Sequence, residues 1–218
     1  MDYHSMTTAS KIGQLKSPER DEVVKVGYLF SAAVLAGGRS VRMGTDKAFL
    51  RLSGEFLVER QLRCLLEAGA AELLISGRAN ADYSRFDVKV IHDEHSAAGP
   101  LAGLAAVLKA AAFQKVLVLA VDMPAMTSKM LVKLLTLGET NSGCVPTGDH
   151  KFQPLVAVYS KTLLPIAEAQ LESGHYSMQE FVRQAIVKDL VRLLPVEPAE
   201  EICFTNWNQP SDCVDISS

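Results

Sequence analysis

The sequence predicts an α/β fold in which a doubly wound, mostly parallel sheet lies between two layers of helices, a three-layer α/β/α arrangement. Apolar segments of strand length alternate with helical patterns at short intervals along the chain. These apolar segments are continuous runs, which are typical of parallel strands that are buried on both faces. The chain has 218 residues, of which 48% are hydrophobic and 22% are charged, and this composition suits one globular domain.

The first part of the chain shows where the domain begins. Residues 1–26 mix balanced charges with Ser and Thr and have no clear hydrophobic period, so we expect a flexible extension. The domain is then expected to span residues 27–218. Its first strand is predicted over residues 32–35 by a short apolar run. A helix is predicted over residues 55–67, where apolar residues can form a buried face and Gly69 can end the helix.

The middle of the chain continues the alternation. Short apolar runs predict strands over residues 72–75 and 88–91. An alanine-rich stretch predicts a helix over residues 101–112, because alanine has the highest helix propensity. A further apolar run predicts a strand over residues 116–120, just before Asp122. In an open α/β sheet, ligands bind at the carboxyl ends of such strands.

The second half of the chain is less regular. A helix is predicted over residues 128–137, and residues 153–159 alternate in the manner of a strand. A helical pattern follows over residues 162–171. Ser177 is suited to cap another helix over residues 178–187, because its hydroxyl can accept a hydrogen bond from the first turn.

Charge and composition exclude several classes of protein. A formal net charge of -3 argues against a protein that binds nucleic acid, because phosphate backbones select for clustered Lys and Arg. The four cysteines form no C-x-x-C pair, which argues against a structural zinc site and favours a reducing, cytoplasmic location. The longest strongly apolar run, residues 116–121, is far shorter than the roughly 20 residues that a membrane span requires.

A glycine-rich segment directly follows the first expected strand. Residues 35–47 read Leu-Ala-Gly-Gly-Arg-Ser-Val-Arg-Met-Gly-Thr-Asp-Lys. Backbone N–H groups in such a loop, together with Arg39, Arg42 and Lys47, suit the binding of a polyphosphate. The spacing matches neither the Walker A loop, because Lys47 lies three residues after Gly44, nor the Rossmann fingerprint. A tight turn with solvated arginines would explain the glycines but not the three cations together.

This loop resembles the signature loop of nucleotidyltransferases that activate small molecules with nucleoside triphosphates. Among these it is most similar to the molybdenum cofactor guanylyltransferases, the MobA family. Further motifs recur in the family's order: Asp93, Gly99-Pro100-Leu101-Ala102-Gly103, Asp122-Met123-Pro124, Gln153-Pro154-Leu155 and Asn206-x-Asn208. The resemblance extends over residues 30–212. It implies a single MobA-like NTP transferase domain with a Rossmann-like nucleotidyltransferase fold.

The resemblance also implies a nucleotide site. The residues that would bind the nucleotide are Leu35, Ala36, Gly37, Lys47, Ser76, Asp93 and Asp122. The first three would offer backbone groups to GTP, and Lys47 would reach its phosphates. Ser76 falls where bacterial family members often have Asn beside the guanine, so this chain departs from the family pattern there. Asp93 has an alternative interpretation, because an acidic residue after a strand can also belong to a polar turn.

The catalytic residues that the resemblance implies are Lys47, Arg42 and Asp122. Asp122 would bind Mg²⁺, for which a carboxylate oxygen is a suitable ligand. Asn206 and Asn208 flank Trp207 at strand-like spacing, so both face the same side and would contact the acceptor. The alternative for the two asparagines is a C-terminal edge strand followed by a turn.

The activity that the resemblance implies is transfer of GMP from GTP to the terminal phosphate of molybdopterin or Mo-molybdopterin, with release of pyrophosphate. The attacking phosphate is already an anion, so no general base is needed. Proteins of molybdenum insertion or molybdoenzyme maturation are implied as partners. Two alternatives stay open, a cytidylyltransferase acting on the molybdenum cofactor or another small phosphate or alcohol, and a non-catalytic NTP-binding adaptor. The presence of both Lys47 and Asp122 argues against the adaptor.

Overall fold

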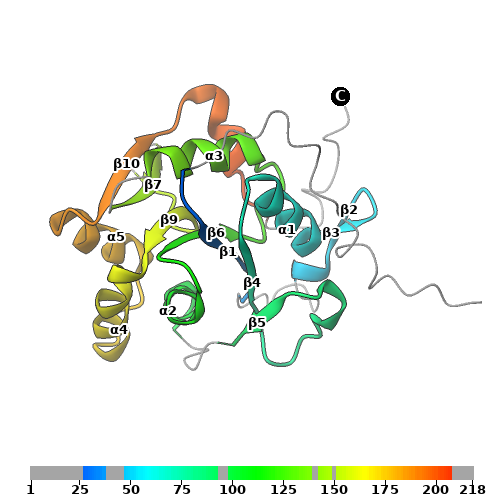
Figure 1. Cartoon of the computed structure of the whole chain (residues 1–218), viewed down its shortest axis with the longest axis horizontal. Helices are drawn as coiled ribbons and strands as arrows, with labels where there is room; N and C mark the ends of the chain where they lie inside the picture. The colour runs from blue at the N-terminus through cyan, green and yellow to red at the C-terminus, as the bar shows by residue number, and fades with distance from the viewer. Residues whose placement is uncertain (1–26, 38–46, 93–97, 139–141, 149–150, 208–218) are drawn as a thin grey trace, which may run out of the picture.

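A mixed β-sheet forms the centre of the molecule (Figure 1). The computed structural model describes residues 27–37, 47–92, 98–138, 142–148 and 151–207. In spatial order the strands of the sheet are β10 (Val191–Pro195), β7 (Gly143–Gly148), β9 (Val156–Ser160), β6 (Lys115–Ala120), β1 (Phe30–Leu35), β4 (Glu72–Ser76) and β5 (Lys89–Ile91). The short strand β8 (Lys151–Phe152) pairs with β7.

Helices cover both faces of this sheet, so the predicted three-layer architecture is confirmed (Figure 1). One face carries α1 (Leu57–Glu67) and α3 (Ser128–Leu137). The other face carries α2 (Pro100–Ala110), α4 (Leu164–Glu172) and α5 (Met178–Val187). Within the described ranges, no helix combines the length and the apolar character that a membrane crossing requires.

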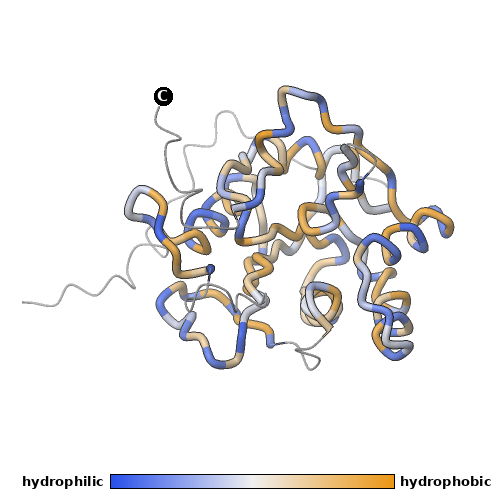
Figure 2. The backbone as a smooth tube through the Cα atoms, turned by 180° about the vertical axis from the view of Figure 1, so that it is seen from behind, coloured by the Kyte–Doolittle hydropathy of each residue, from blue (hydrophilic) through white to orange (hydrophobic). Residues whose placement is uncertain are grey.

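Each face of the sheet has its own hydrophobic core. Ala32 and Val34 of β1 face the core under α1 and α3, whereas Ala33 faces the core under α2, α4 and α5. All three side chains are fully buried, which explains why the strand reads as a continuous apolar run. Figure 2 shows mainly hydrophobic backbone through the middle of the molecule and hydrophilic stretches towards its outside.

Local sequence signals determine where several helices begin. Thr127 caps α3 and Ser177 caps α5, because each hydroxyl accepts a hydrogen bond from the backbone N–H three residues later. These two helices have the predicted bounds. Helix α2 begins at Pro100, a residue that suits the first helical position because it lacks an N–H group.

Two of the predicted helices begin later than expected. Helix α1 begins at Leu57 rather than at residue 55, because β3 (Glu55–Phe56) pairs with β2 (Arg51–Leu52) in a small hairpin. Helix α4 begins at Leu164, because a 3₁₀ turn, η4 (Lys161–Leu163), comes before it. Both differences lie at element ends, where pairing with another segment or a tighter turn competes with the α-helical pattern.

The half of the sheet beyond β6 differs most from the prediction. Strand β9 runs antiparallel to both β6 and β7, so the sheet is mostly parallel but mixed. Strands β7 and β10 were not predicted. The sequence of β7 contains glycines and Pro146, which favour turns, and β10 buries only Val191 and Leu194. Their pairing comes from burial between neighbouring elements rather than from local strand propensity.

Gly143 lies where β7 approaches β9 most closely. A Cβ atom at this position would overlap the backbone carbonyl oxygen of Val158, which cannot rotate away. We therefore expect Gly143→Ala to lower the free energy of unfolding by about 1–3 kcal/mol, measured by urea denaturation. Gly27→Ala is the matched control, because no described atom lies within 4 Å of a Cβ at Gly27. Equal stability of both variants would contradict this close approach.

The cysteines that the structure describes are part of the core. Cys64, Cys144 and Cys203 are free and buried. Burial raises the pKa of the Cys64 thiol to about 12 and that of the Cys144 thiol to about 11. Because the thiolate is the reactive form, these two residues behave as small apolar side chains rather than as nucleophiles.

Candidate active site

The carboxyl ends of β1, β4 and β6 meet at one edge of the sheet and bring predicted site residues together. Leu35, the last residue of β1, pairs with Ser76 on one side and with the end of β6 on the other. The pairing continues past the strand, because the Ala36 N–H donates to the Ser76 carbonyl at 2.8 Å and the Val121 N–H donates to the Leu35 carbonyl at 3.1 Å. Leu35 and Ala36 therefore lie between Ser76 and the segment that leads to Asp122.

Lys47 and Asp122 form an ion pair at this edge. Lys47 is the first residue of the 3₁₀ helix η2 (Lys47–Phe49), and its Nζ lies 3.2 Å from Oδ2 of Asp122. The two side chains are 21% and 25% exposed, so a ligand can reach them from solvent. A cation and an anion in contact at the carboxyl edge of the sheet are suited to a phosphate and a divalent cation respectively.

The segment around Trp207 contacts both members of this pair. The Trp207 N–H donates to the backbone carbonyl of Asp122 at 2.8 Å, and the Trp207 carbonyl accepts a hydrogen bond from Lys47 Nζ at 3.1 Å. The Trp207 side chain is buried, whereas the neighbouring Asn206 is exposed. Asn206, the predicted acceptor residue, directly precedes Trp207 in the chain, and its contact with an acceptor stays a prediction.

Helix α1 holds the loop that follows Asp122. The Gln61 side-chain amide donates to the Met123 carbonyl at 2.7 Å, and the Arg60 Nε donates to the Pro124 carbonyl at 2.7 Å. Gln61 is fully buried, and its Oε1 has no hydrogen-bond partner among the described residues. The sequence prediction missed this residue, although a Gln three positions after Val58 on the buried face of a helix is an available signal.

Ser76 lies beneath the first turns of α2. Its side chain is buried, and a Cβ atom at Gly103 would lie only 2.7 Å from its Oγ. Gly103 therefore allows α2 to approach the end of β4 closely. The Ser76 hydroxyl faces the helix, and its backbone carbonyl accepts the Ala36 N–H because the pairing of β1 and β4 continues past Leu35. The assignment of Ser76 to a base contact stays a prediction.

Several other predicted residues cannot be compared with the structure. Arg39, Arg42, Asp93 and Asn208 lie outside the described residues. Gly37 is described and follows Ala36 directly, at the start of the glycine-rich segment. The predicted roles of these five residues stay predictions.

The described residues fit a magnesium ion that is shared with a substrate. They contain no group of three His, Cys, Asp or Glu side chains that could hold a metal alone. Asp122 supplies one carboxylate, which is partly exposed. Mg²⁺ commonly binds proteins through one or two carboxylates and takes its other ligands from substrate phosphates and water. A single partly exposed carboxylate beside a lysine is therefore compatible with that ion.

Two hollows in the described part of the structure are large enough for a small molecule. One has a volume of about 370 Å³ and is lined by Gly148, Lys151, Gln153, Val196, Glu201 and Phe204. Its lining is linked to the segment that leads to Asp122, because Leu155, two residues after Gln153, accepts a hydrogen bond from the Ala120 N–H. Its polar groups, an amine and an amide among them, make it the hollow of interest for a second substrate.

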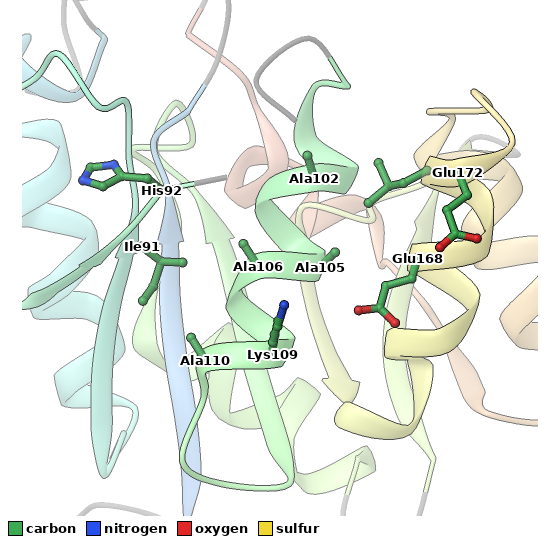
Figure 3. Close-up of a pocket in the computed structure, with 10 residues that line it drawn as sticks. Ile91, His92, Ala102, Ala105, Ala106, Lys109, Ala110, Glu168 and Glu172 are labelled. Atoms are coloured by element: carbon green, nitrogen blue, oxygen red, sulfur yellow. The ribbon is translucent and has the colours of Figure 1, made fainter. Parts of the chain in front are cut away.

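The other hollow, of about 440 Å³, extends along the outer face of α2 (Figure 3). Alanines of α2 form its floor, with Lys109 among them. Glu168 and Glu172 of α4 lie on one side and His92 on the opposite side. None of the sequence-predicted site residues lines this hollow, so we do not assign the nucleotide to it.

Comparison with known proteins identifies the family. A profile of the MobA-like NTP transferase domain matches residues 32–190. This chain belongs to the MobA-like NTP transferase family. The match covers the glycine-rich segment, Lys47 and Asp122, so the predicted resemblance and the predicted nucleotidyltransferase class are confirmed.

Individual relatives of this MobA-like NTP transferase agree with that result. It is 43% identical over 185 residues to the "Probable molybdenum cofactor guanylyltransferase" of Opitutus terrae, covering 84% of this chain and 92% of that protein. It is 33% identical to the molybdenum cofactor guanylyltransferase of Pseudomonas putida, covering 83% and 93%. The structure matches molybdopterin-guanine dinucleotide biosynthesis protein A from Archaeoglobus fulgidus with a TM-score of 0.68 at 28% identity, covering 84% and 94%. The Rossmann-like fold is confirmed.

Proposed function

We propose that this chain transfers GMP from GTP to the terminal phosphate of molybdopterin, with or without molybdenum, and forms the guanine dinucleotide cofactor. The observation that carries the proposal is the Lys47–Asp122 ion pair, which lies beside the end of β1 and the glycine-rich segment. Relatives named molybdenum cofactor guanylyltransferase support the choice of substrates. The reducing cytoplasm suits a chain whose described cysteines are free thiols.

In this reaction an oxygen of the molybdopterin phosphate forms a bond to the α-phosphorus of GTP. The bond between that phosphorus and the bridging oxygen of the leaving pyrophosphate breaks. The attacking oxygen already carries negative charge, so the protein mainly positions the two phosphates and offsets their charge. Lys47 would contact the triphosphate, and the backbone groups of Leu35, Ala36 and Gly37 would lie along the nucleotide.

Asp122 would hold the Mg²⁺ ion. When bound, Mg²⁺ neutralises charge on the phosphates and orients them for in-line attack. Lys47 contributes a second, fixed positive charge, and the two cations together would stabilise the charge on the leaving pyrophosphate. Asn206 and Asn208 would contact the acceptor.

The hollow beside Lys151 and Gln153 would receive part of the acceptor. It lies at the same edge of the sheet as the ion pair, on the side away from β4. The Lys151 amine suits an anionic group, and the Phe204 ring in the same hollow suits a flat heterocycle. Molybdopterin carries both kinds of group.

Pyrophosphate release tests the proposed function. The protein is incubated with Mg²⁺, molybdopterin and each of the four nucleoside triphosphates in separate reactions. Of the four nucleoside triphosphates, we expect only GTP to release pyrophosphate, and only when molybdopterin is present. Release with CTP instead would establish a cytidylyltransferase, and GTP binding without release would establish a non-catalytic binding protein. Partner proteins of molybdenum insertion or molybdoenzyme maturation would be tested by co-purification.

A further inference from the structure

The segment that follows β10 crosses the molecule and ends at the ion pair. We call residues 198–207 the C-terminal arm; it consists of the 3₁₀ helix η5 (Pro198–Phe204) and the three residues after it. Figure 1 shows this orange-to-red segment passing over α3 towards α1. Its last residue, Trp207, is the only tryptophan of the chain.

The arm is anchored before it reaches the site. Lys133 of α3 donates to both carboxylate oxygens of Glu200, at 2.7 and 2.9 Å. This contact raises the pKa of Lys133 and lowers the pKa of Glu200, so both groups are charged at neutral pH. Glu197 and Glu200 also form a capping box at the start of η5, which fixes the residue at which this 3₁₀ helix begins.

The end of the arm is held by burial. Phe204 and Trp207 are 8% exposed and belong to the same core cluster as Met123 and Met126, which follow Asp122. A buried indole removes a large apolar area from water and packs against many neighbours. The position of the Trp207 backbone is therefore determined by its own side chain as well as by the anchor at Glu200.

One peptide residue thus contacts both members of the ion pair. Trp207 donates from its N–H to the backbone of Asp122 and accepts from the Lys47 ammonium with its carbonyl, at 2.8 and 3.1 Å. The Asp122 carboxylate is a charged ligand that other cations compete for. The Trp207 carbonyl is neutral, so its hydrogen bond with Lys47 does not depend on the charge of the carboxylate.

We infer that the C-terminal arm is a positioning element, in which the buried Trp207 side chain fixes the Trp207 carbonyl as the acceptor that keeps the Lys47 ammonium at the site. The inference rests on the proposed function only for its effect on turnover. The hydrogen bond from Lys47 to the Trp207 carbonyl forms within the protein and needs no ligand. It makes Trp207 a positioning residue rather than a catalytic one.

Three variants test this role. Trp207→Ala removes the buried ring, Trp207→Phe keeps a buried aromatic ring, and Ile202→Ala changes an exposed residue of the same arm. The first readout is the rate at which acetic anhydride acetylates Lys47 in the absence of nucleotide, measured by peptide mass spectrometry. The exposed residues Lys109 and Lys188 serve as internal references.

We expect Trp207→Ala to increase the acetylation rate of Lys47 about fivefold or more, because the end of the arm opens more often. Trp207→Phe and Ile202→Ala should stay within about twofold of the wild-type rate, since the arm remains anchored. In the transfer assay, Trp207→Ala should lower kcat about 10- to 100-fold through misplacement of Lys47, with recovery in Trp207→Phe. A folded Trp207→Ala protein with wild-type acetylation of Lys47 would overturn the inference.

A second pair of variants applies if Trp207→Ala does not fold. Lys133→Met removes the ion pair that anchors the arm, and Arg183→Met removes an exposed ion pair on α5, to Glu180. Only Lys133→Met should shift the fluorescence emission of Trp207 to longer wavelength, and it should speed the acetylation of Lys47 by up to about fivefold, because a partly exposed ion pair contributes about 0–1 kcal/mol. If Lys133→Met and Arg183→Met gave the same Trp207 emission and the same Lys47 acetylation rate, the inference would be overturned. Because acetylation needs no substrate, a failure of guanylyl transfer would not affect this result.

Discussion

Asp122→Asn is expected to reduce kcat for pyrophosphate release by about 1,000-fold, while GTP binding without metal changes little. The substitution keeps the size of the side chain and the backbone contact to Trp207, but it removes the negative charge that would hold Mg²⁺. Kinetics at saturating GTP and molybdopterin measure the loss, and isothermal titration calorimetry with GTP in EDTA measures binding. A variant with wild-type kcat would show that Asp122 holds no catalytic metal.

The matched control for Asp122→Asn is Glu168→Gln. Glu168 is an exposed carboxylate on α4, in the hollow to which we assign no substrate. Its substitution removes the same charge and should leave kcat unchanged. The two variants together separate loss of a metal ligand from a general effect of net charge on phosphate substrates. Adding Mn²⁺ should not rescue Asp122→Asn fully, because the carboxylate oxygen is absent.

The first half of the sheet could be predicted because its local and tertiary signals agree. Strands β1, β4, β5 and β6 are parallel, and most of their residues are apolar. Strand β7 shows the opposite case. Pro146 has no N–H for the ladder and favours a turn, yet it pairs with Leu194 of β10 inside the sheet. Strand β7 forms because it lies between β9 and β10 in the sheet, and its own sequence does not contain that information.

The sequence prediction named Lys47 and Asp122, which the structure brings together, but it did not name the contacts around them. Lys47 and Asp122 are separated by 75 residues, and each belongs to a recognisable motif. The carbonyl of Trp207, 160 residues after Lys47, could not be found by residue type, because every residue has a carbonyl. Such a backbone contact depends on the path of the chain. Gln61 differs, because a polar residue on the buried face of α1 is visible in the sequence, although its partner, the backbone of Met123, is not.

The second large effect is expected for Lys47→Met. This variant keeps the length and apolar stem of the side chain and removes the ammonium that would contact the triphosphate. We expect kcat/KM for GTP to fall about 100- to 1,000-fold, because a fixed positive charge at a phosphate site is lost. Steady-state pyrophosphate release measures this value. Lys109→Met, on the outer face of α2, is the control and should keep the wild-type value.

Stability measurements decide whether these losses come from the site or from the fold. The Lys47–Asp122 pair is partly exposed, and such pairs contribute only about 0–1 kcal/mol to folding. Neither single variant should therefore unfold the protein, and a loss of about 1,000-fold corresponds to roughly 4 kcal/mol of transition-state stabilisation. If both groups act on the same phosphates, the double variant should lose less than the product of the two single losses. Fully multiplicative losses would mean that Lys47 and Asp122 act independently, which would contradict a shared phosphate site.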